Sequence, residues 1–400
     1  MTNDKNNIVA SKLSKASFLV LALFVALIFT NNHSALFIAD YYYALVVFVA
    51  CGIGIVLISG KIKIDYFNIL NFILFIILIL NSIFRANDVD NGTLKSYIAW
   101  FATLIIVPNM IPTERSINLL LKSFIVGSLV CAIMIFVFKV TYGETHRYTI
   151  KFINNEIVDP NYLGCFLWIG LTFCLFFIAQ TIGQYKSMKS VILYSFLAVV
   201  ILCAIVLTGS RAAYLCSFLS AIGFFLQIWK RKNERYFLLF AGIIVLIVTV
   251  VCYIEIIPEE IKVRFGFSSL KDDSNAQRLE HWYWGLRAFL LHPFGYGAAH
   301  TKYVLTEYVG HRSDAHNTYI TLLLQFGVVG FFIFLYLFIR LIKPFFKSKS
   351  PFWILFITAF IFNGFIIANH LGVPFWVTIV VLYYVGNSKV FESYVKFNKR

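Results

Sequence analysis

The sequence predicts an all-α integral membrane protein with about twelve transmembrane helices. Of its 400 residues, 60% are hydrophobic and only 13% are charged, a composition that ordinary soluble domains do not have. Apolar stretches of about 17 to 25 residues, the length that a helix needs to cross roughly 30 Å of hydrocarbon, also recur along the whole chain. Both observations indicate a chain that folds within a bilayer.

The apolar stretches are continuous and do not alternate polar with apolar residues, so we expect helices and not the strands of a membrane barrel. We find no internal repeat and no separate soluble part, and therefore expect one polytopic domain over residues 1–400. The expected spans lie near 14–31, 36–59, 66–84, 95–112, 118–138, 161–180, 191–208, 212–229, 236–256, 316–339, 352–370 and 373–387.

The formal net charge of +15 is explained by the position of the basic residues. They cluster between alternate spans, for example at Lys61 and Lys63, in "KRKNER" at 230–235, and in the C-terminal tail. By the positive-inside rule these loops are cytoplasmic, so we expect both termini to be cytoplasmic. Because the charge sets the orientation in the membrane, no nucleic-acid partner is expected.

Two longer segments, 140–160 and 257–315, are predicted to lie outside the cytoplasm. Within the second, "NAQRLEHWYWGLRAFLLHPFGYG" (275–297) carries apolar residues at three- and four-residue spacing, with basic residues among them. This pattern predicts an amphipathic helix, rich in aromatic side chains, that lies along the outer leaflet over the bundle. The proline and the glycines of "HPFGYG" are expected to end it.

Three arginines are candidates for binding an anionic group. Arg211 is expected at the outer start of a span, where free N–H groups and the helix dipole favour phosphate; the alternative is an interfacial arginine that reaches the headgroups. Arg278 and Arg287 offer guanidinium groups that suit phosphate oxygens, or else they form the solvated face of the amphipathic helix. Several arginines around one outer cavity suit a pyrophosphate that must leave as an anion.

His316 is the candidate general base, because an imidazole titrates near neutrality and can take a proton from a sugar hydroxyl as that oxygen attacks. Asp314 is expected to cap the following helix or to orient the ring, and Asn317 to hold a hydroxyl or a phosphate oxygen. The alternative is a histidine with a purely structural role at a helix mouth. Further along, Gly327 and Gly330 are expected to let a neighbouring helix approach closely.

A zinc site built from His300, His311, Asp314 and His316 would lack the compact ligand spacing of known sites. We therefore expect no metal and no other cofactor.

Three short motifs carry a resemblance to a known family. "HN" is followed by nine residues and "GVVG"; "RLEHWYWGLRAFLLHPFGYG" precedes it, and "GSRAAYL" lies further upstream. Their order, with the long outer loop between them, resembles the O-antigen ligase and polysaccharide polymerase family of bacterial envelopes. The motifs span residues 208–330, and the twelve-span frame covers nearly the whole chain.

The resemblance implies a metal-independent inverting glycosyltransferase of the bacterial cytoplasmic (inner) membrane. Members of this family transfer a glycan from undecaprenyl pyrophosphate to an acceptor sugar on the outer side of that membrane. By this resemblance His316 corresponds to the motif histidine proposed as the base, and Arg211 and Arg278 match motif arginines that face the lipid pyrophosphate. The family pattern does not include Arg287, whose assignment rests on charge and location.

Ligases and polymerases share this chemistry and differ in the acceptor, which is lipid A core or the growing lipid-linked chain. "VDPNYLG" (158–164) resembles polymerase-like members and favours a polymerase. Asp159 and Asn161 in this stretch either contact sugar hydroxyls or form a helix cap followed by a proline. The implied partners are an undecaprenyl-pyrophosphate-linked oligosaccharide donor, a sugar acceptor, membrane lipids, a chain-length regulator and a flippase.

Two other classes of protein are considered. A lipid-linked oligosaccharide flippase or transporter should place ionisable residues at mid-depth in the membrane, and the expected spans contain almost none there. A receptor or scaffold would use the outer loop for binding only. The order of the motifs favours the enzyme over both alternatives.

Overall fold

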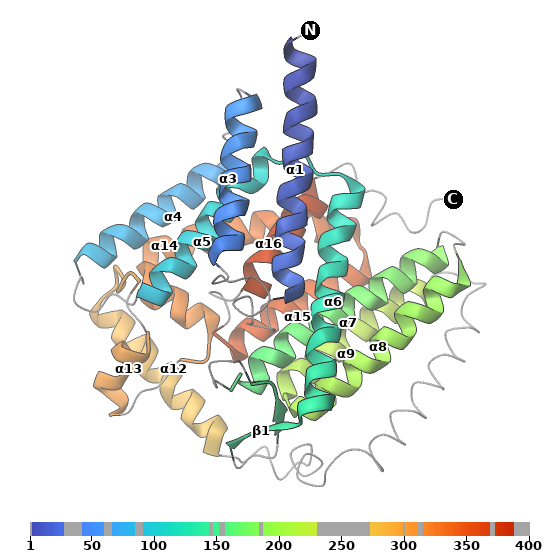
Figure 1. Ribbon diagram of the computed structural model, residues 1–400. Coiled ribbons are helices and arrows are strands. Elements are labelled where there is room, and N and C mark those ends of the chain that lie inside the picture. The colour runs from blue at the N-terminus through green and yellow to red at the C-terminus, as the bar shows by residue number, and fades with distance from the viewer. Residues whose placement is uncertain are drawn as a thin grey trace.

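The computed structural model describes the chain over eleven ranges, which are almost entirely helical (Figure 1). The described residues are 2–27, 42–59, 66–84, 91–143, 147–151, 157–183, 187–229, 273–298, 301–310, 315–368 and 373–387.

Every expected span except the one near 236–256 coincides with a helix, and that span lies outside the described residues. Seven helices are long and apolar enough to cross a membrane, so the prediction of a helical membrane protein is confirmed, while the number of spans stays a prediction. The helices are α1 (Thr2–Leu27), α3 (Tyr42–Ser59), α4 (Tyr66–Ile83), α5 (Asn91–Ile106, continued by the 3₁₀ turn η2 at Val107–Asn109), α6 (Glu114–Phe138), α7 (Pro160–Gly183), α8 (Met188–Thr208), α9 (Arg211–Trp229), α14 (Thr318–Ser348), α15 (Pro351–Ile366) and α16 (Val373–Asn387).

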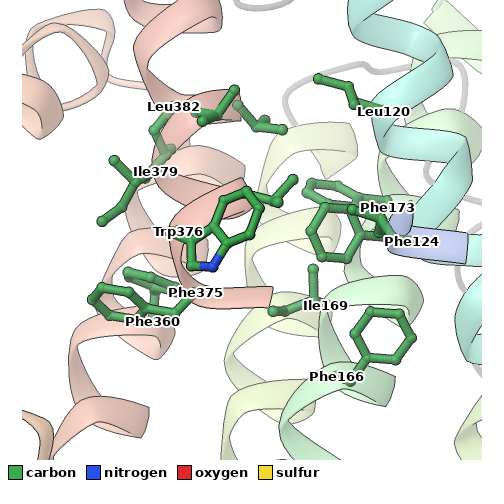
Figure 2. Close-up of a cluster of buried hydrophobic side chains, with 14 of the residues drawn as sticks. Leu120, Phe124, Phe166, Ile169, Phe173, Phe360, Phe375, Trp376, Ile379 and Leu382 are labelled. Carbon is green, nitrogen blue, oxygen red and sulfur yellow. The ribbon is translucent and has the colours of Figure 1, made fainter. Parts of the chain in front are cut away.

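The main core lies where α6, α7, α15 and α16 meet (Figure 2). Aromatic rings fill it, and Phe124 of α6 packs against Phe173 of α7 with ring centroids 5.4 Å apart. Phe360 of α15 stacks on Phe375 of α16 at 5.0 Å. α7 is the central helix, because it packs against α6, α8 and α9 and its apolar stretch is 89% buried.

A short β-hairpin, which the sequence did not predict, follows α6. Lys139 ends that helix in the left-handed conformation, with φ of 47°. Strands β1 (Val140–Tyr142) and β2 (Arg147–Thr149) then pair antiparallel, with Tyr142 opposite Arg147. The hairpin brings the chain back to the start of α7.

The predicted amphipathic helix is α12 (Asp273–Leu291), and a second helix that was not predicted, α13 (Thr301–Val309), follows it. Both pack against the first turns of α14. Together they enclose a hydrophobic cluster separate from the main core, which we call the cap. The buried residues of the cap are Ala288, Tyr296, Val304, Leu305, Ala315, Ile320 and Leu324.

Hydrogen bonds between distant segments show that the hairpin, the α8–α9 turn, the cap and the ends of α4 and α15 gather at one end of the bundle, which we call the site end. In a bundle whose successive helices run in opposite directions, every second connection lies at the same end, so these segments are expected to lie together. The bonds run from Arg147 Nε to Thr208 O (2.8 Å), from Tyr162 Oη to Ala368 O (2.9 Å), from Thr318 Oγ1 to Ile367 O (2.6 Å) and from Asn81 Nδ2 to Phe294 O (2.6 Å).

Candidate functional site

Arg211 is the first residue of α9, immediately after a tight turn from α8. Gly209 ends α8 in the left-handed conformation, with φ of 57°, and its N–H donates to Val206 O at 3.0 Å. On the α7 side, Gly164 leaves room for this turn, since a Cβ there would lie 2.9 Å from the Cβ of Ser210. The turn therefore holds the half-buried Arg211 at a helix N-terminus, as predicted.

Arg147 of β2 is a candidate for supporting the α8–α9 turn, and sequence reasoning missed it. Its side chain is only 5% exposed; Nε donates to Thr208 O at 2.8 Å and Nη2 donates to Asn161 Oδ1 at 2.9 Å. A cation at the last carbonyls of α8 interacts favourably with the helix dipole. The sequence offers Lys139 and Lys151 in the same segment, but both are exposed, and only the fold distinguishes Arg147 from them.

Asp159 caps α7, which is one of the two roles expected for it. Its Oδ1 accepts a hydrogen bond from Asn161 N at 2.7 Å, and Pro160 is the first helical residue. Burial raises the pKa of the Tyr142 phenol, the charge of Asp159 raises it further, and Arg147 lowers it. These groups therefore lie within electrostatic reach of one another, and contact of Asp159 or Asn161 with a sugar stays a prediction.

The α14 N-terminus is capped by Asn317. Asp314, which was also expected to cap this helix or to orient the ring, lies outside the described residues. Asn317 Oδ1 accepts from Tyr319 N at 2.9 Å and from Ile320 N at 3.1 Å. Because that oxygen already accepts hydrogen bonds from two N–H groups of the helix, the predicted contact of Asn317 with the substrate would use its amide nitrogen. His316, just before the cap, is half-buried and has φ of 47°, a left-handed conformation that is uncommon for a non-glycine residue.

The expectation that Gly327 lets a neighbouring helix approach was wrong, because Gly327 breaks α14 and a turn enters the break. Its φ is 68° and its ψ is −174°. The carbonyls of Leu324 and Gln325 accept from Tyr296 N at 2.7 Å and from Gly297 N at 2.9 Å. The "PFGYG" turn thus replaces helical hydrogen bonds of α14.

The turn approaches so closely that no side chain fits between the two backbones. A Cβ on Gly327 would lie 2.2 Å from the carbonyl carbon of Phe294, and one on Gly295 would lie 2.5 Å from Gly327 N. The end of α4 holds the turn in place, since Asn81 Nδ2 donates to Phe294 O at 2.6 Å and Ser82 Oγ accepts from Ala298 N at 2.8 Å. The two motifs therefore form one interlocked unit.

The break at Gly327 also decides where His316 lies. At 1.5 Å per residue, α14 would extend roughly 46 Å if straight, whereas α15 extends roughly 24 Å. Nevertheless Thr318 Oγ1, at the start of α14, donates to Ile367 O just beyond the end of α15, at 2.6 Å. The two ends meet because the break redirects the first turns of α14, which brings His316 back to the end of the bundle.

α12 places His281 beside His316. The ring centroids of the two histidines are 6.3 Å apart with 30° between their planes, and His281 is only 6% exposed. Gly285, one turn later, allows the close approach of α12, because a Cβ there would lie 2.7 Å from Ile320 Cγ2. Arg278 lies one turn before His281, on the same side of the helix and half-buried.

Arg287 lies away from this pair. Nine residues separate it from Arg278, which places the two roughly 180° apart around α12. Its side chain is exposed, and the guanidinium carbon lies 5.3 Å from the centre of the Trp284 ring. A role for Arg287 in binding substrate stays a prediction that the geometry of α12 does not favour.

Arg211 and His316 both lie at the site end, each at a helix N-terminus, and residues 367–368 connect their surroundings. Ile367 O accepts from Thr318, and Ala368 O accepts from Tyr162 of α7. α7 in turn carries the Gly164 surface that contacts the α8–α9 turn. A direct approach of Arg211, Arg278 and His316 to one substrate stays a prediction.

No group of three or more His, Cys, Asp or Glu side chains is placed to hold a metal ion among the residues that the structure describes. Three of the four residues considered for zinc, His300, His311 and Asp314, lie outside them.

The fold and the site define a polytopic helical membrane protein whose polar chemistry gathers at one end of the bundle. Residues 196–335 match the family model described as O-antigen ligase. Because this segment contains the α8–α9 turn, α12 and the start of α14, the resemblance to the O-antigen ligase and polymerase-like family is confirmed. No curated protein and no solved structure gives a significant match.

Proposed function

We propose that this protein is a glycosyltransferase that transfers a glycan from undecaprenyl pyrophosphate to an acceptor sugar. We further propose that it polymerises the repeat units of a surface polysaccharide such as O-antigen, capsule or exopolysaccharide. The observation that carries the proposal is the position of three distant motif residues at one end of the bundle. Arg211, Arg278 and His316 come from α9, α12 and the start of α14, and the matched family segment contains all three.

The proposed reaction is a direct displacement at the anomeric carbon. The acceptor hydroxyl forms the new C–O bond as His316 takes its proton. The bond between the anomeric carbon and the pyrophosphate oxygen breaks, and its electron pair stays with undecaprenyl pyrophosphate. Attack opposite to the leaving group inverts the configuration, and the activated donor supplies the free energy.

Two arginines at the site end support this chemistry. Arg211 combines a guanidinium group with the N-terminus of α9, where backbone N–H groups favour an anion. Arg278 adds a second guanidinium group one turn before His281, on the same side of α12. Fixed cations of this kind stabilise the charge that develops on a leaving pyrophosphate.

The distribution of basic residues supports an extracytoplasmic site end. Basic residues gather at the opposite end of the bundle. They are Arg115 in the first turn of α6, Lys189 in the first turn of α8, and the exposed Lys343, Lys347 and Lys349 at the end of α14. A basic end is expected to be cytoplasmic. Both termini would then be cytoplasmic, and the protein would act in the bacterial cytoplasmic membrane on substrates at its outer side.

A ligase that joins the glycan to lipid A core is the second candidate, because the matching family model is described as O-antigen ligase. "VDPNYLG" favours the polymerase. A flippase is the alternative of another class, and it would move the lipid-linked donor without changing its length.

Variants of the three motif residues test the proposal. A strain of the source bacterium that lacks its own copy would carry His316→Ala, Arg211→Ala or Arg278→Ala at matched expression. The measurements are the length of the surface polysaccharide on gels and the amount of lipid-linked repeat units on the outer side. Arg115→Ala, an exposed arginine in the first turn of a helix at the other end, is the matched control.

The outcomes separate the candidates. A polymerase is supported when ladders collapse to single repeats while the lipid-linked donor accumulates outside and the control behaves as wild type. A ligase is indicated when full-length chains form but stay on undecaprenyl pyrophosphate. A flippase is indicated when the donor accumulates on the cytoplasmic side. Unchanged ladders and pools in all three variants would show that the assignment of the site is wrong.

A further inference from the structure

α4 and α14 pack side by side and run in opposite directions (Figure 1). At the site end, Asn81 Nδ2 of α4 donates to Gln325 O of α14 at 3.5 Å. At the opposite end, which we call the basic end, the guanidinium carbon of Arg340 lies 4.7 Å from the centre of the Tyr66 ring. Fifteen residues separate the two contacts on each helix, so one register holds along the whole pair.

This register sets the depth of Arg340 in the membrane. α4 has 18 residues, which extend roughly 27 Å and so just cross the hydrocarbon, and Tyr66 is the first of them. An aromatic residue at the end of a span is typical of the membrane–water interface. Arg340 therefore lies at the level of the interface, and the part of α14 that follows it, up to Ser348, extends roughly 12 Å further, into the headgroup layer.

Three basic side chains share one face of this end of α14, and we call them the basic stripe. Arg340, Lys343 and Lys347 follow one another at three- and four-residue spacing, so they lie within about 60° of one another around the helix. All three are exposed. Neither α4 nor α14 contains an aspartate or a glutamate, and Asp65, which precedes α4, lies outside the described residues. The stripe therefore carries positive charge that neither helix neutralises.

The same face of α14 continues into the membrane with large apolar side chains. Val329, Phe332 and Tyr336 precede Arg340 at three- and four-residue spacing and are 53%, 60% and 50% exposed. A cationic stripe above a strip of exposed apolar side chains matches the two parts of a phospholipid, its charged headgroup and its acyl chains. A free anion would use only the first of these parts.

We propose that this face of α14, together with Tyr66, binds an anionic phospholipid such as phosphatidylglycerol from the leaflet at the basic end. Its phosphate contacts Arg340, whose guanidinium group suits phosphate oxygens and is held by the cation–π contact with Tyr66. Lys343 and Lys347 add charge within the headgroup layer, and an acyl chain lies along Phe332. The site does not depend on the proposed function, because it requires only that the two helices cross the membrane.

The alternative is that the basic stripe only orients α14 in the membrane, as basic residues near the ends of spans do in general. The same end of the bundle offers a matched comparison. Arg115 and Lys122 of α6 and Lys189 of α8 are also exposed, but they are divided between two helices, and Glu114 precedes Arg115. Replacing these three residues removes as much charge as replacing the stripe.

The test uses the purified full-length protein in detergent, titrated with phosphatidylglycerol or with zwitterionic phosphatidylcholine. Native mass spectrometry counts the bound lipids and gives the Kd of each. The stripe variant is Arg340→Gln/Lys343→Gln/Lys347→Gln, and the control variant is Arg115→Gln/Lys122→Gln/Lys189→Gln. Lys343→Gln alone, a single exposed change, gives the answer if the stripe variant does not fold. Inorganic phosphate is added as a competitor in a separate titration.

We expect phosphatidylglycerol to bind the wild type more tightly than phosphatidylcholine does. Its affinity should fall roughly 100-fold in the stripe variant and about fivefold in Lys343→Gln, from the usual contribution of each basic residue near a membrane surface. The control variant should stay within about twofold of wild type, because salt screens charges that do not contact the headgroup. Inorganic phosphate should not displace the lipid, since it lacks the acyl chains.

Other results would overturn the inference. Equal affinities of the wild type for the two lipids would show that the headgroup charge is not recognised. Equal losses in the stripe and control variants would mean that the basic end attracts anionic lipid as a whole and contains no site. Displacement of the lipid by inorganic phosphate would indicate a site for a free anion instead. The polysaccharide ladders test the proposed function separately, so a failure of either proposal leaves the other standing.

Discussion

The main core and the cap are built in different ways. The main core is a broad contact of aromatic and aliphatic side chains between helices, as around Phe124 and Phe375. The cap has a smaller cluster and depends on backbone meeting backbone, where Gly295 and Gly327 touch without side chains between them. The stability of the core is therefore spread over many side-chain contacts, whereas the geometry of the cap depends on a few backbone atoms.

This difference indicates which substitutions should mainly affect stability and which should mainly affect activity. A side chain in the core can be shortened and its neighbours adjust, so the loss of free energy is moderate. A glycine in the interlocked turn cannot gain an atom without moving a backbone that also carries the candidate base. Substitutions in the cap should therefore affect activity more than stability, and those in the core should do the reverse.

The largest expected effect is that of Gly327→Ala. The added Cβ would lie 2.2 Å from the carbonyl carbon and oxygen of Phe294, and φ of 68° is itself strained for alanine. We expect the "PFGYG" turn to leave the break, and polysaccharide ladders to be lost while the bundle stays folded. Gel analysis together with the Tm of the purified protein checks this.

Gly310→Ala is the control for backbone strain alone. Gly310 has φ of 76° but nothing lies within 4 Å of an added Cβ. It should keep most of the activity. If it abolished activity as fully as Gly327→Ala does, strain and not the interlock would be responsible.

Arg147→Ala should have the next largest effect. It removes two hydrogen bonds from a buried guanidinium group, to Thr208 O and to Asn161 Oδ1, and a bond to a charged group contributes about 1.5–3 kcal/mol. We expect a lower Tm and lower activity, because the turn that carries Arg211 loses its support.

Arg147→Lys should not restore the activity, since a single ammonium group cannot reproduce the forked contacts of a guanidinium. Lys151→Ala, an exposed basic residue beside the same hairpin, is the control. Full activity in Arg147→Ala would mean that the hairpin does not position the α8–α9 turn.

Asn317→Ala should destabilise the protein by about 1 kcal/mol, the usual cost of losing a helix N-cap. Asn317→Asp keeps an oxygen that can accept from Tyr319 N and Ile320 N, and it should keep the Tm. The comparison of Tm with activity then separates the two roles of Asn317. An aspartate variant with normal Tm and lost activity would indicate that the amide nitrogen contacts the substrate.

The smallest effect on activity is expected in the main core. Ile169, on α7, is 1% exposed and lies in the cluster of Figure 2. Ile169→Val removes one methylene and should lower the free energy of unfolding by about 0.5–1.5 kcal/mol, with normal polysaccharide ladders. A large loss of activity at normal Tm would contradict the division between the two regions.

Much of the fold could be predicted from the sequence, because a membrane helix is a local feature. A run of apolar residues long enough to cross the bilayer satisfies its own backbone hydrogen bonds, whatever lies beside it. α7 and α8 begin and end close to the expected residues for this reason. α13 has only nine residues and no apolar run, so it was not predicted.

The site could be predicted in part. The helix N-terminus at Arg211 and the histidine before α14 follow from local pattern and from the family motifs. Arg147 was missed because three basic residues in its segment look alike until the hairpin buries one of them. His281 was missed as a partner because its neighbour His316 lies on a different helix.

The sequence by itself determined the class of protein, the positions of most helices, the amphipathic helix α12 and the motif residues, since composition and periodicity act over short stretches of chain. Only the tertiary structure decided that Gly327 breaks α14, that the "PFGYG" turn enters the break, and that His281 lies beside His316. These features depend on the register between segments far apart in the chain. Packing selects that register, and no local pattern encodes it.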